Sequence, residues 1–178
     1  MTAAADGEPL LNGTVQAEWV DYNDHMNVAY YPMAFDKAVD QIFTGWLALG
    51  PEFTRREKFG AFALQSMYHN LRELRNGQRY CIFGRILDFD EKFILLFLSM
   101  SRECDNVLAA TCEQLLVGVD MVSRRSMPFP APIYSAIGNV ARRHVQLPRP
   151  RHAGRSIAIR GGDRSQRQRG PAATSYKD

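Results

Sequence analysis

The strongest periodic pattern of apolar residues lies between residues 35 and 49. Apolar side chains recur there three or four positions apart, as on one face of a helix, and polar side chains occupy the opposite face. The apolar positions are Phe35, Ala38, Val39, Ile42, Phe43, Trp46 and Leu49. Pro32 suits the first helical turn and Gly50 suits a stop. The pattern predicts one long helix whose aromatic-rich face needs a broad cover.

Runs of β-branched, aromatic and aliphatic residues predict strands on both sides of this helix. One short strand is expected before it, over residues 13–20. The strands expected after it cover residues 62–74, 79–87, 93–101 and 107–120. Segments with the residue types of hairpin turns separate these runs, at residues 75–78, 88–92 and 103–106. The order predicts an α+β fold in which the long helix packs on one face of an antiparallel meander, with a short final helix over residues 133–141.

Length and charge divide the chain into three parts. Its 178 residues, 46% of them hydrophobic, provide one ordinary domain. We expect a flexible leader over residues 1–12, a folded domain over 13–141 and a basic, disordered tail over 142–178, where apolar periodicity ends. The tail carries a net charge of +8 and the rest −5, so the formal +3 describes neither part. Deleting the tail is expected to spare the main activity. Tyr176 is the only Phe, Tyr or Trp residue of the tail, which is poor for stacking on bases, so we expect no nucleic-acid partner.

The cysteines and the hydropathy pattern favour a cytoplasmic protein. Cys81, Cys104 and Cys112 are odd in number and lack the spacing of zinc ligands, which indicates reduced thiols. The longest apolar stretch, residues 93–98, is too short to cross a bilayer. The first residues lack the pattern of a signal peptide. We therefore expect no metal, no cofactor and no membrane association.

The densest group of chemically capable side chains is segment 21–27, directly before the helix. Asp21, Asn23 and His25 place a carboxylate, an amide and an imidazole within five residues. Unpaired N–H groups at the helix start would polarise a carbonyl oxygen placed there, as in an oxyanion hole. The alternative is structural: Asn23 or Asn27 caps the helix while Asp21 and His25 form a turn. The spacing alone leaves both interpretations open.

The sequence WVDYNDHMNVAYY, at residues 19–31, resembles the signature of hot-dog-fold acyl thioesterases. Its D-x-N-x-H-x-N-x-x-Y order is similar to that of plant acyl-ACP thioesterases, and it also resembles the loop of the 4-hydroxybenzoyl-CoA thioesterase-like group. The wording DYN-x-HMN-x-x-YY, followed by F-D-x-A-x-D, is most similar to bacterial betainyl-CoA thioesterases of carnitine degradation. The resemblance covers roughly residues 13–141 and implies a long helix wrapped by a curved antiparallel sheet.

The resemblance also implies roles for particular residues. Asp21, Asn23 and His25 match the catalytic loop, and Glu73 stands where plant relatives have a contributing glutamate near the end of the next long strand. Relatives with a longer loop have a glycine before the histidine, where this chain has Asp24. The implied reaction is thioester hydrolysis without a metal. A carboxylate of Asp21 or Glu73 deprotonates water or attacks the acyl carbon, and helix-start amides hold the oxyanion.

An acyl-CoA is the implied substrate, and the candidate binding residues are Asn27, Tyr30, Tyr31, Arg55 and Arg56. Arg55 and Arg56 are expected in a basic loop after the helix, which either meets the phosphates of coenzyme A or is simply solvated. The tyrosines either belong to the core or line an acyl pocket, where they would attract a quaternary ammonium group.

The superfamily pairs two sheets edge to edge and places its active sites at the junction. The resemblance therefore implies a homodimer or homotetramer, in which pairing would also protect an open sheet edge. Two other functions stay open. One is a hot-dog hydratase or dehydratase acting on acyl thioesters. The other is a non-catalytic acyl-CoA-binding module, which would bind tightly without turnover.

Overall fold

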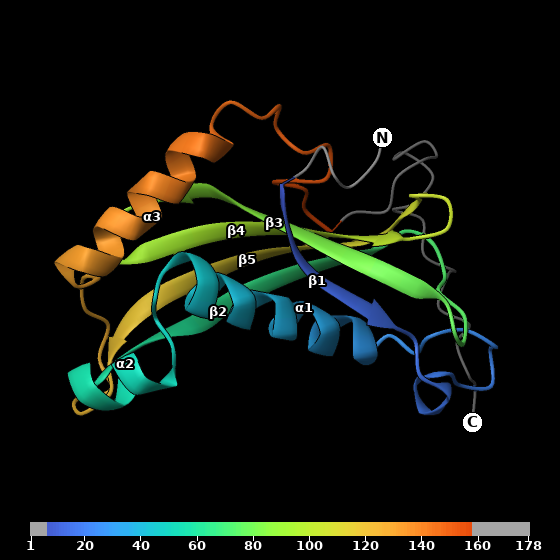
Figure 1. Ribbon diagram of the computed structural model, residues 1–178, viewed down its shortest axis with the longest axis horizontal. Coiled ribbons are helices and arrows are strands. Elements are labelled where there is room, and N and C mark those ends of the chain that lie inside the picture. The colour runs from blue at the N-terminus through green and yellow to red at the C-terminus, as the bar shows by residue number, and fades with distance from the viewer. Residues whose placement is uncertain (1–6, 158–178) are drawn as a thin grey trace, which may run out of the picture.

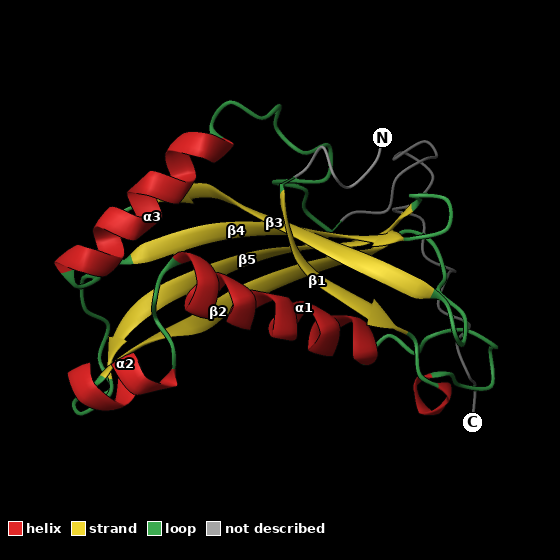
Figure 2. Cartoon of the chain, viewed as in Figure 1, coloured by secondary structure: helices red, strands yellow, loops and turns green. Residues whose placement is uncertain are grey.

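The fold is a five-stranded antiparallel sheet with one long helix across its face. The computed structural model describes residues 7–157. Across the sheet the strands follow the order β1-β3-β4-β5-β2. Their bounds are β1 Glu8–Thr14, β2 Phe59–Asn70, β3 Arg79–Phe89, β4 Phe93–Arg102 and β5 Leu108–Asp120. The sheet curves around helix α1, Tyr30–Gln41, while helix α3, Ala131–His144, lies at one corner (Figures 1 and 2).

The core lies between α1 and the sheet. Helix α1 buries one face, made of Tyr31, Ala34, Phe35, Ala38 and Val39. The buried strand residues of the same core cluster include Ile82, Ile94, Leu96, Leu98 and Met100. Fully burying one such aliphatic side chain stabilises the fold by about 1.5–3 kcal/mol relative to leaving it exposed. The α+β prediction, with a long helix wrapped by a curved antiparallel sheet as in the hot-dog fold, is confirmed.

The first strand lies earlier than the sequence predicts. Strand β1 begins at Glu8 and ends at Thr14, whereas the expected strand covers residues 13–20. It pairs with β3, and its Leu10 and Leu11 pack against the core, which is why these residues of the expected leader are ordered into the sheet. Residues Ala17–Trp19 form a 3-10 turn instead of a strand. The predicted domain boundary at residue 13 therefore falls inside β1.

Two of the three predicted hairpins are present. Turn residues 88–92 join β3 to β4, and residues 103–106 join β4 to β5. Strand β2, however, pairs with β5 and not with β3, so residues 75–78 cross from one side of the sheet to the other. The expectation of a four-strand meander is wrong at this point. Turn chemistry marks where a chain reverses, but it does not fix which strand lies alongside.

The long helix ends differently from the prediction. After α1 the chain passes through a π-helical turn, Ile42–Trp46, in which the Leu47 N–H donates to the Ile42 carbonyl. A separate helix α2, Pro51–Glu57, follows and starts with proline in its first turn. Arg55 and Arg56 therefore lie on a short helix and not in the predicted loop.

The folded part also extends beyond the predicted boundary at residue 141. Helix α3 ends at His144, whose buried ring accepts a hydrogen bond from the Ile86 N–H at 3.1 Å. Further along, the Gly154 N–H donates to Glu113 at 2.6 Å. These contacts contradict the expectation that the whole of residues 142–178 is a disordered tail. Deleting that segment would remove them. Residues 158–178 of that segment lie outside the described residues.

Candidate active site

The loop before α1 is a tight turn closed by backbone hydrogen bonds. Val20 and Met26 form an antiparallel bridge, and the Asp24 N–H donates to the Asp21 carbonyl at 3.0 Å. Asp24 has a φ of 60°, in the left-handed region that Asp tolerates better than most residues with a Cβ. The chain reverses sharply there, so His25 directly follows the turn.

The Asp21 carboxylate is held from two sides. Its Oδ1 accepts from the Asn23 N–H at 2.9 Å, and its Oδ2 accepts from Asn27 Nδ2 at 2.8 Å. The Asn23 backbone hydrogen bond is the largest cause that lowers the pKa of Asp21, with further contributions from Asn27 and from the charge of His25. Asp21 is therefore a fixed carboxylate whose pKa is lowered, so it stays ionised to a lower pH than an ordinary aspartate does.

Asn27 links this carboxylate to the start of α1. Its Nδ2 donates to Asp21, while its Oδ1 accepts from the Ala29 N–H at 3.0 Å. The Tyr30 N–H donates to the Asn27 carbonyl. Two of the amides expected to point outward are thus occupied. The Val28 N–H has no acceptor within residues 7–157, which makes it the best placed oxyanion donor in this segment.

His25 and Glu73 line the same small cavity, of about 260 Å³. The lining residues are His25, Met26, Val28, Tyr31, Asn70, Leu71, Arg72 and Glu73. The Met26 N–H donates to the Leu74 carbonyl at 2.7 Å and so ties the two segments together. Glu73 follows the end of β2 at Asn70, instead of lying within the strand.

The Glu73 carboxylate has a partner that the sequence analysis missed. Arg75 donates to Glu73 Oε1 from Nη2 at 2.6 Å and from Nε at 3.0 Å. This pairing is the main reason that the pKa of Glu73 lies below the usual value for glutamate. The sequence did contain a signal for this ion pair, because Arg75 is only two residues away from Glu73 in a turn.

Burial raises the pKa of the neighbouring Tyr31 phenol, which keeps the phenol protonated.

The His25 ring has a defined orientation. Its Nδ1 lies 3.2 Å from the Met26 carbonyl oxygen. A carbonyl oxygen only accepts hydrogen bonds, so Nδ1 carries the proton and, in the neutral ring, Nε2 is left as an acceptor. Such a ring can accept a proton from water or, once protonated, return one to a leaving group.

Tyr30 occupies a different place from Tyr31. Its ring stacks on Trp19 with centroids 5.4 Å apart, and its hydroxyl donates to the Glu18 carbonyl at 3.2 Å. Tyr30 therefore attaches the turn at Ala17–Trp19 to the helix start, and it is not among the residues that line the 260 Å³ cavity.

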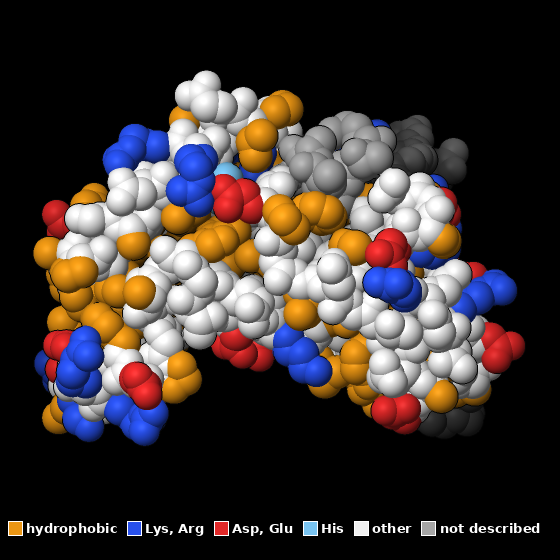
Figure 3. Space-filling view, in the orientation of Figure 1, with side chains coloured by type: hydrophobic (Ala, Val, Ile, Leu, Met, Phe, Trp, Pro, Cys, Tyr) orange, Lys and Arg blue, Asp and Glu red, His pale blue; other side chains and the backbone are white. Residues whose placement is uncertain are grey.

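Arg55 and Arg56 lie at the opposite end of α1 from this loop, on α2 (Figure 1). Arg55 lines a cavity of about 570 Å³ together with Phe43 and the start of β2. Arg56 forms an ion pair with Glu57 at 2.7 Å. Figure 3 shows basic and acidic side chains grouped at this end of the molecule. Within one chain, the structure does not bring the two arginines to the catalytic candidates.

The sequence profile of the thioesterase-like superfamily matches residues 15–137, so the chain belongs to this superfamily. It is 29% identical to a betainyl-CoA thioesterase of Pseudomonas aeruginosa over 82% of this chain and 91% of that one. It is also 29% identical to an L-carnitine dehydrogenase/betainyl-CoA thioesterase of Rhizobium meliloti, over 83% of this chain but only 29% of that much longer one.

Solved structures show the same fold. A hypothetical protein of Staphylococcus aureus, solved in complex with CoA, superposes with a TM-score of 0.79 and 28% identity, over 86% of this chain and 97% of that one. A putative thioesterase of Pseudomonas putida KT2440 superposes with a TM-score of 0.74 and 26% identity, over 87% and 98% of the two chains.

The described residues contain neither a group of potential metal ligands nor a membrane-spanning helix. Among residues 7–157, no three His, Cys, Asp or Glu side chains are grouped so that they could hold a metal ion. No helix in the same range is long and apolar enough to span a membrane.

Proposed function

We propose that the protein hydrolyses the thioester bond of a small acyl-CoA. The observation that carries this proposal is the pair of ionised carboxylates at one helix start. Asp21 is fixed by Asn23 and Asn27, and Glu73 lines a cavity with His25. Membership of the thioesterase-like superfamily supports the same chemistry.

In the proposed reaction, a carboxylate of Asp21 or Glu73 takes a proton from water while the water oxygen attacks the thioester carbon. The carbonyl oxygen becomes an oxyanion, which the Val28 N–H stabilises. The C–S bond then breaks, and the protonated carboxyl group passes its proton to the thiolate, either directly or through His25, which regenerates the carboxylate. Direct attack by the carboxylate, followed by hydrolysis of the resulting anhydride, is the covalent form of the same reaction.

The proposed acyl group is small and cationic, as in betainyl-CoA. The relatives from P. aeruginosa and R. meliloti carry that substrate in their names. The cavity of about 260 Å³ has Tyr31 and Glu73, together with Arg72, among its lining residues. An aromatic ring and a carboxylate both attract a quaternary ammonium group. This assignment would give the protein a place in carnitine metabolism; the cytoplasmic location stays a prediction.

The proposed assembly is a dimer through strand β2. This twelve-residue strand lies at one edge of the sheet, and Leu64 on it is 58% exposed. In antiparallel pairing about a two-fold axis, the Phe59 end of one β2 lies beside the Asn70 end of the other. Helix α2 of one protomer would then approach the cavity of its partner, where Arg55 or Arg56 could bind a phosphate of coenzyme A. A homotetramer would add a second interface to this pair.

A substrate panel tests the proposed activity. Betainyl-CoA and short, medium and aromatic acyl-CoAs are incubated with the protein, and free CoA is measured with a thiol reagent. We expect stoichiometric thiol release, fastest with betainyl-CoA. A hydratase or dehydratase would change the acyl group without releasing thiol. Tight binding with no thiol release would identify a non-catalytic binding module and overturn the proposal.

A further inference from the structure

A second cavity, of about 450 Å³, lies between β3 and α3 and shares no lining residue with the candidate active site. Its walls come from Arg85–Phe89 of β3 and from α3 and the segment that follows it. The volume is within the range of about 300–1,000 Å³ that is usual for small-molecule sites. Thioester hydrolysis, as proposed above, makes no use of this cavity.

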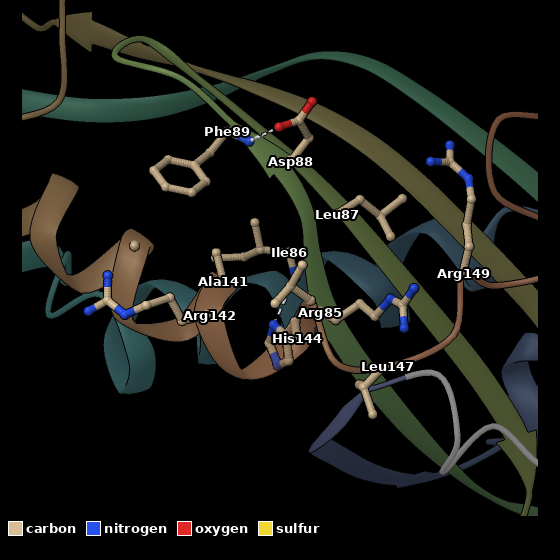
Figure 4. Close-up of a pocket in the computed structure, with 12 residues that line it drawn as sticks. Arg85, Ile86, Leu87, Asp88, Phe89, Ala141, Arg142, His144, Leu147 and Arg149 are labelled. Atoms are coloured by element: carbon tan, nitrogen blue, oxygen red, sulfur yellow. Dashed lines mark hydrogen bonds between the residues drawn. The ribbon is translucent and has the colours of Figure 1, made fainter.

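The middle of the cavity is apolar. Figure 4 shows Ile86 and Leu87 on β3 and Ala141 on α3, and these three residues lie between the two ends of the cavity. The apolar lining continues with Phe89, Val145 and Leu147. His144 also lines the cavity, and its ring is neutral near neutral pH. Its Nδ1 accepts from the Ile86 N–H, and burial lowers the pKa of the ring. A ligand lying along this wall would therefore need a hydrocarbon body.

The charges that line the cavity are mostly positive. Arg85, Arg142 and Arg149 line it, and Arg85 is only 3% exposed. In Figure 4, Arg85 and Arg149 lie toward one end of the cavity and Arg142 lies toward the other. Within residues 7–157, no ion pair involves Arg142 or Arg149. Asp88 is the one acidic residue among the described lining residues, and its Oδ1 already accepts from the Phe89 N–H.

We propose that this cavity binds an organic acid with an apolar body, its carboxylate between Arg85 and Arg149 and its hydrocarbon part along Ile86, Leu87 and Ala141. A guanidinium group presents paired N–H donors that match a carboxylate. Because Arg85 is buried, its attraction for an anion is screened less than that of a surface arginine. An acid of this kind is the general product class of acyl-CoA hydrolysis, but the binding site itself does not depend on that activity.

Octanoate is a suitable probe, measured by titration calorimetry and by amide NMR shifts on the full chain. We expect saturable binding, with the largest shifts at Ile86 and Leu147. The variant Arg149→Gln should weaken binding at least about tenfold, as expected from the loss of a charge-assisted hydrogen bond to the carboxylate. Arg151→Gln is the matched control, because Arg151 lies on the same segment but does not line the cavity, and it should leave the affinity unchanged.

Two other probes, octanol and inorganic phosphate, test separately whether binding needs the negative charge and the apolar body. Octanol should bind at least about tenfold more weakly than octanoate, since it lacks the charge that the arginines recognise. Inorganic phosphate should also bind more weakly, since it lacks the apolar body. Equal binding of either probe would overturn the proposal. So would shifts centred on Val28 and Leu71, which would place octanoate in the candidate active site instead.

Discussion

The two ends of helix α1 differ in what they offer a substrate. At the N-terminal end, the cavity is only about 260 Å³, and both carboxylates of this end have defined partners: Glu73, which lines the cavity, is held by Arg75, and Asp21, in the turn before α1, is held by Asn27. At the C-terminal end, the cavity is larger, about 570 Å³, and Asp40 and Arg55 are its charged residues. We propose the N-terminal end as the site of the reaction because it carries the fixed, ionised groups, although the cavity at the other end is larger.

The comparison also shows what a single chain lacks. Arg72 is the one arginine or lysine among the described residues that line the cavity at the end with carboxylates, and its Nη1 donates to the Leu71 carbonyl. The end with Arg55 has no carboxylate–histidine pair. Pairing of two β2 strands would join the unlike ends of two protomers into one site.

The largest effect is expected from Asp21→Asn. The amide keeps an oxygen that can accept from the Asn23 N–H, so the turn should persist through this bond and the Val20–Met26 bridge, although the bond from Asn27 is lost. The amide cannot act as a base or nucleophile. We expect kcat/KM for the best acyl-CoA to fall about 100-fold or more, in line with the usual contribution of acid–base groups. Steady-state kinetics by thiol release measures this, with circular dichroism as the check on folding.

Asp24→Asn is the matched control for that variant. It removes the same charge from the same turn, and Asn tolerates the left-handed conformation of this position. Its activity should stay within about threefold of the wild type, because a surface charge alone contributes little. An equal loss in both variants would mean that Asp21 acts only through the net charge of the loop.

Much of the N-terminal end could be predicted from the sequence. The helix was visible because burial of one face imposes a period that the sequence must follow, as Phe35, Ala38 and Val39 show. The grouping of Asp21 with His25 follows from their closeness in the chain. The hydrogen-bond partners of Asn27 could not be predicted in the same way. Its Oδ1 accepts from the Ala29 N–H beside the helix start, and its Nδ2 also donates to Asp21.

The parts that could not be predicted depend on contacts between distant residues. The pairing of β2 with β5 joins Phe59 to Asp120, and no local pattern encodes it. His144 was assigned to a tail because residues near it are basic and polar, yet its ring is buried against Ile86. Composition reports the average of a segment, whereas a single well-placed residue is enough to attach it to the core.

A smaller effect is expected from Leu64→Lys, which tests the junction between the two ends. A lysine on an edge strand disfavours pairing with a second strand, so the variant should sediment as a monomer. If the partner's α2 completes the site, kcat/KM should fall about tenfold through lost substrate positioning. Analytical ultracentrifugation and thiol-release kinetics, at the same protein concentration, measure the two quantities.

Val122→Lys serves as the control, because Val122 is 74% exposed and lies outside β2. It should keep both the assembly and the activity. A monomeric Leu64→Lys variant with full activity would show that each chain forms a complete site alone. Arg55→Gln should keep the dimer and raise KM about three- to tenfold, as expected for one solvent-accessible phosphate contact.

The smallest effect is expected from Arg75→Gln, and it decides between the two carboxylates. Arg75 lowers the pKa of Glu73, so the charged form persists to lower pH, and activity that needs ionised Glu73 is lost only as pH falls through that lowered pKa. Without Arg75 the pKa of Glu73 rises toward its usual value. The acid limb of the kcat/KM profile should then move to higher pH, while the rate near pH 7.5 changes by less than about twofold.

Arg79→Gln is the control for this profile, because it breaks another exposed ion pair, with Glu103, at the start of β3. It should leave the acid limb where it is. If Arg75→Gln also leaves the limb in place, the ionisation that governs the reaction belongs to Asp21, whose pKa is lowered by Asn23 and not by Arg75. Glu73 would then be a residue that positions the substrate, and the base of the reaction would be the carboxylate that the turn before α1 holds in place.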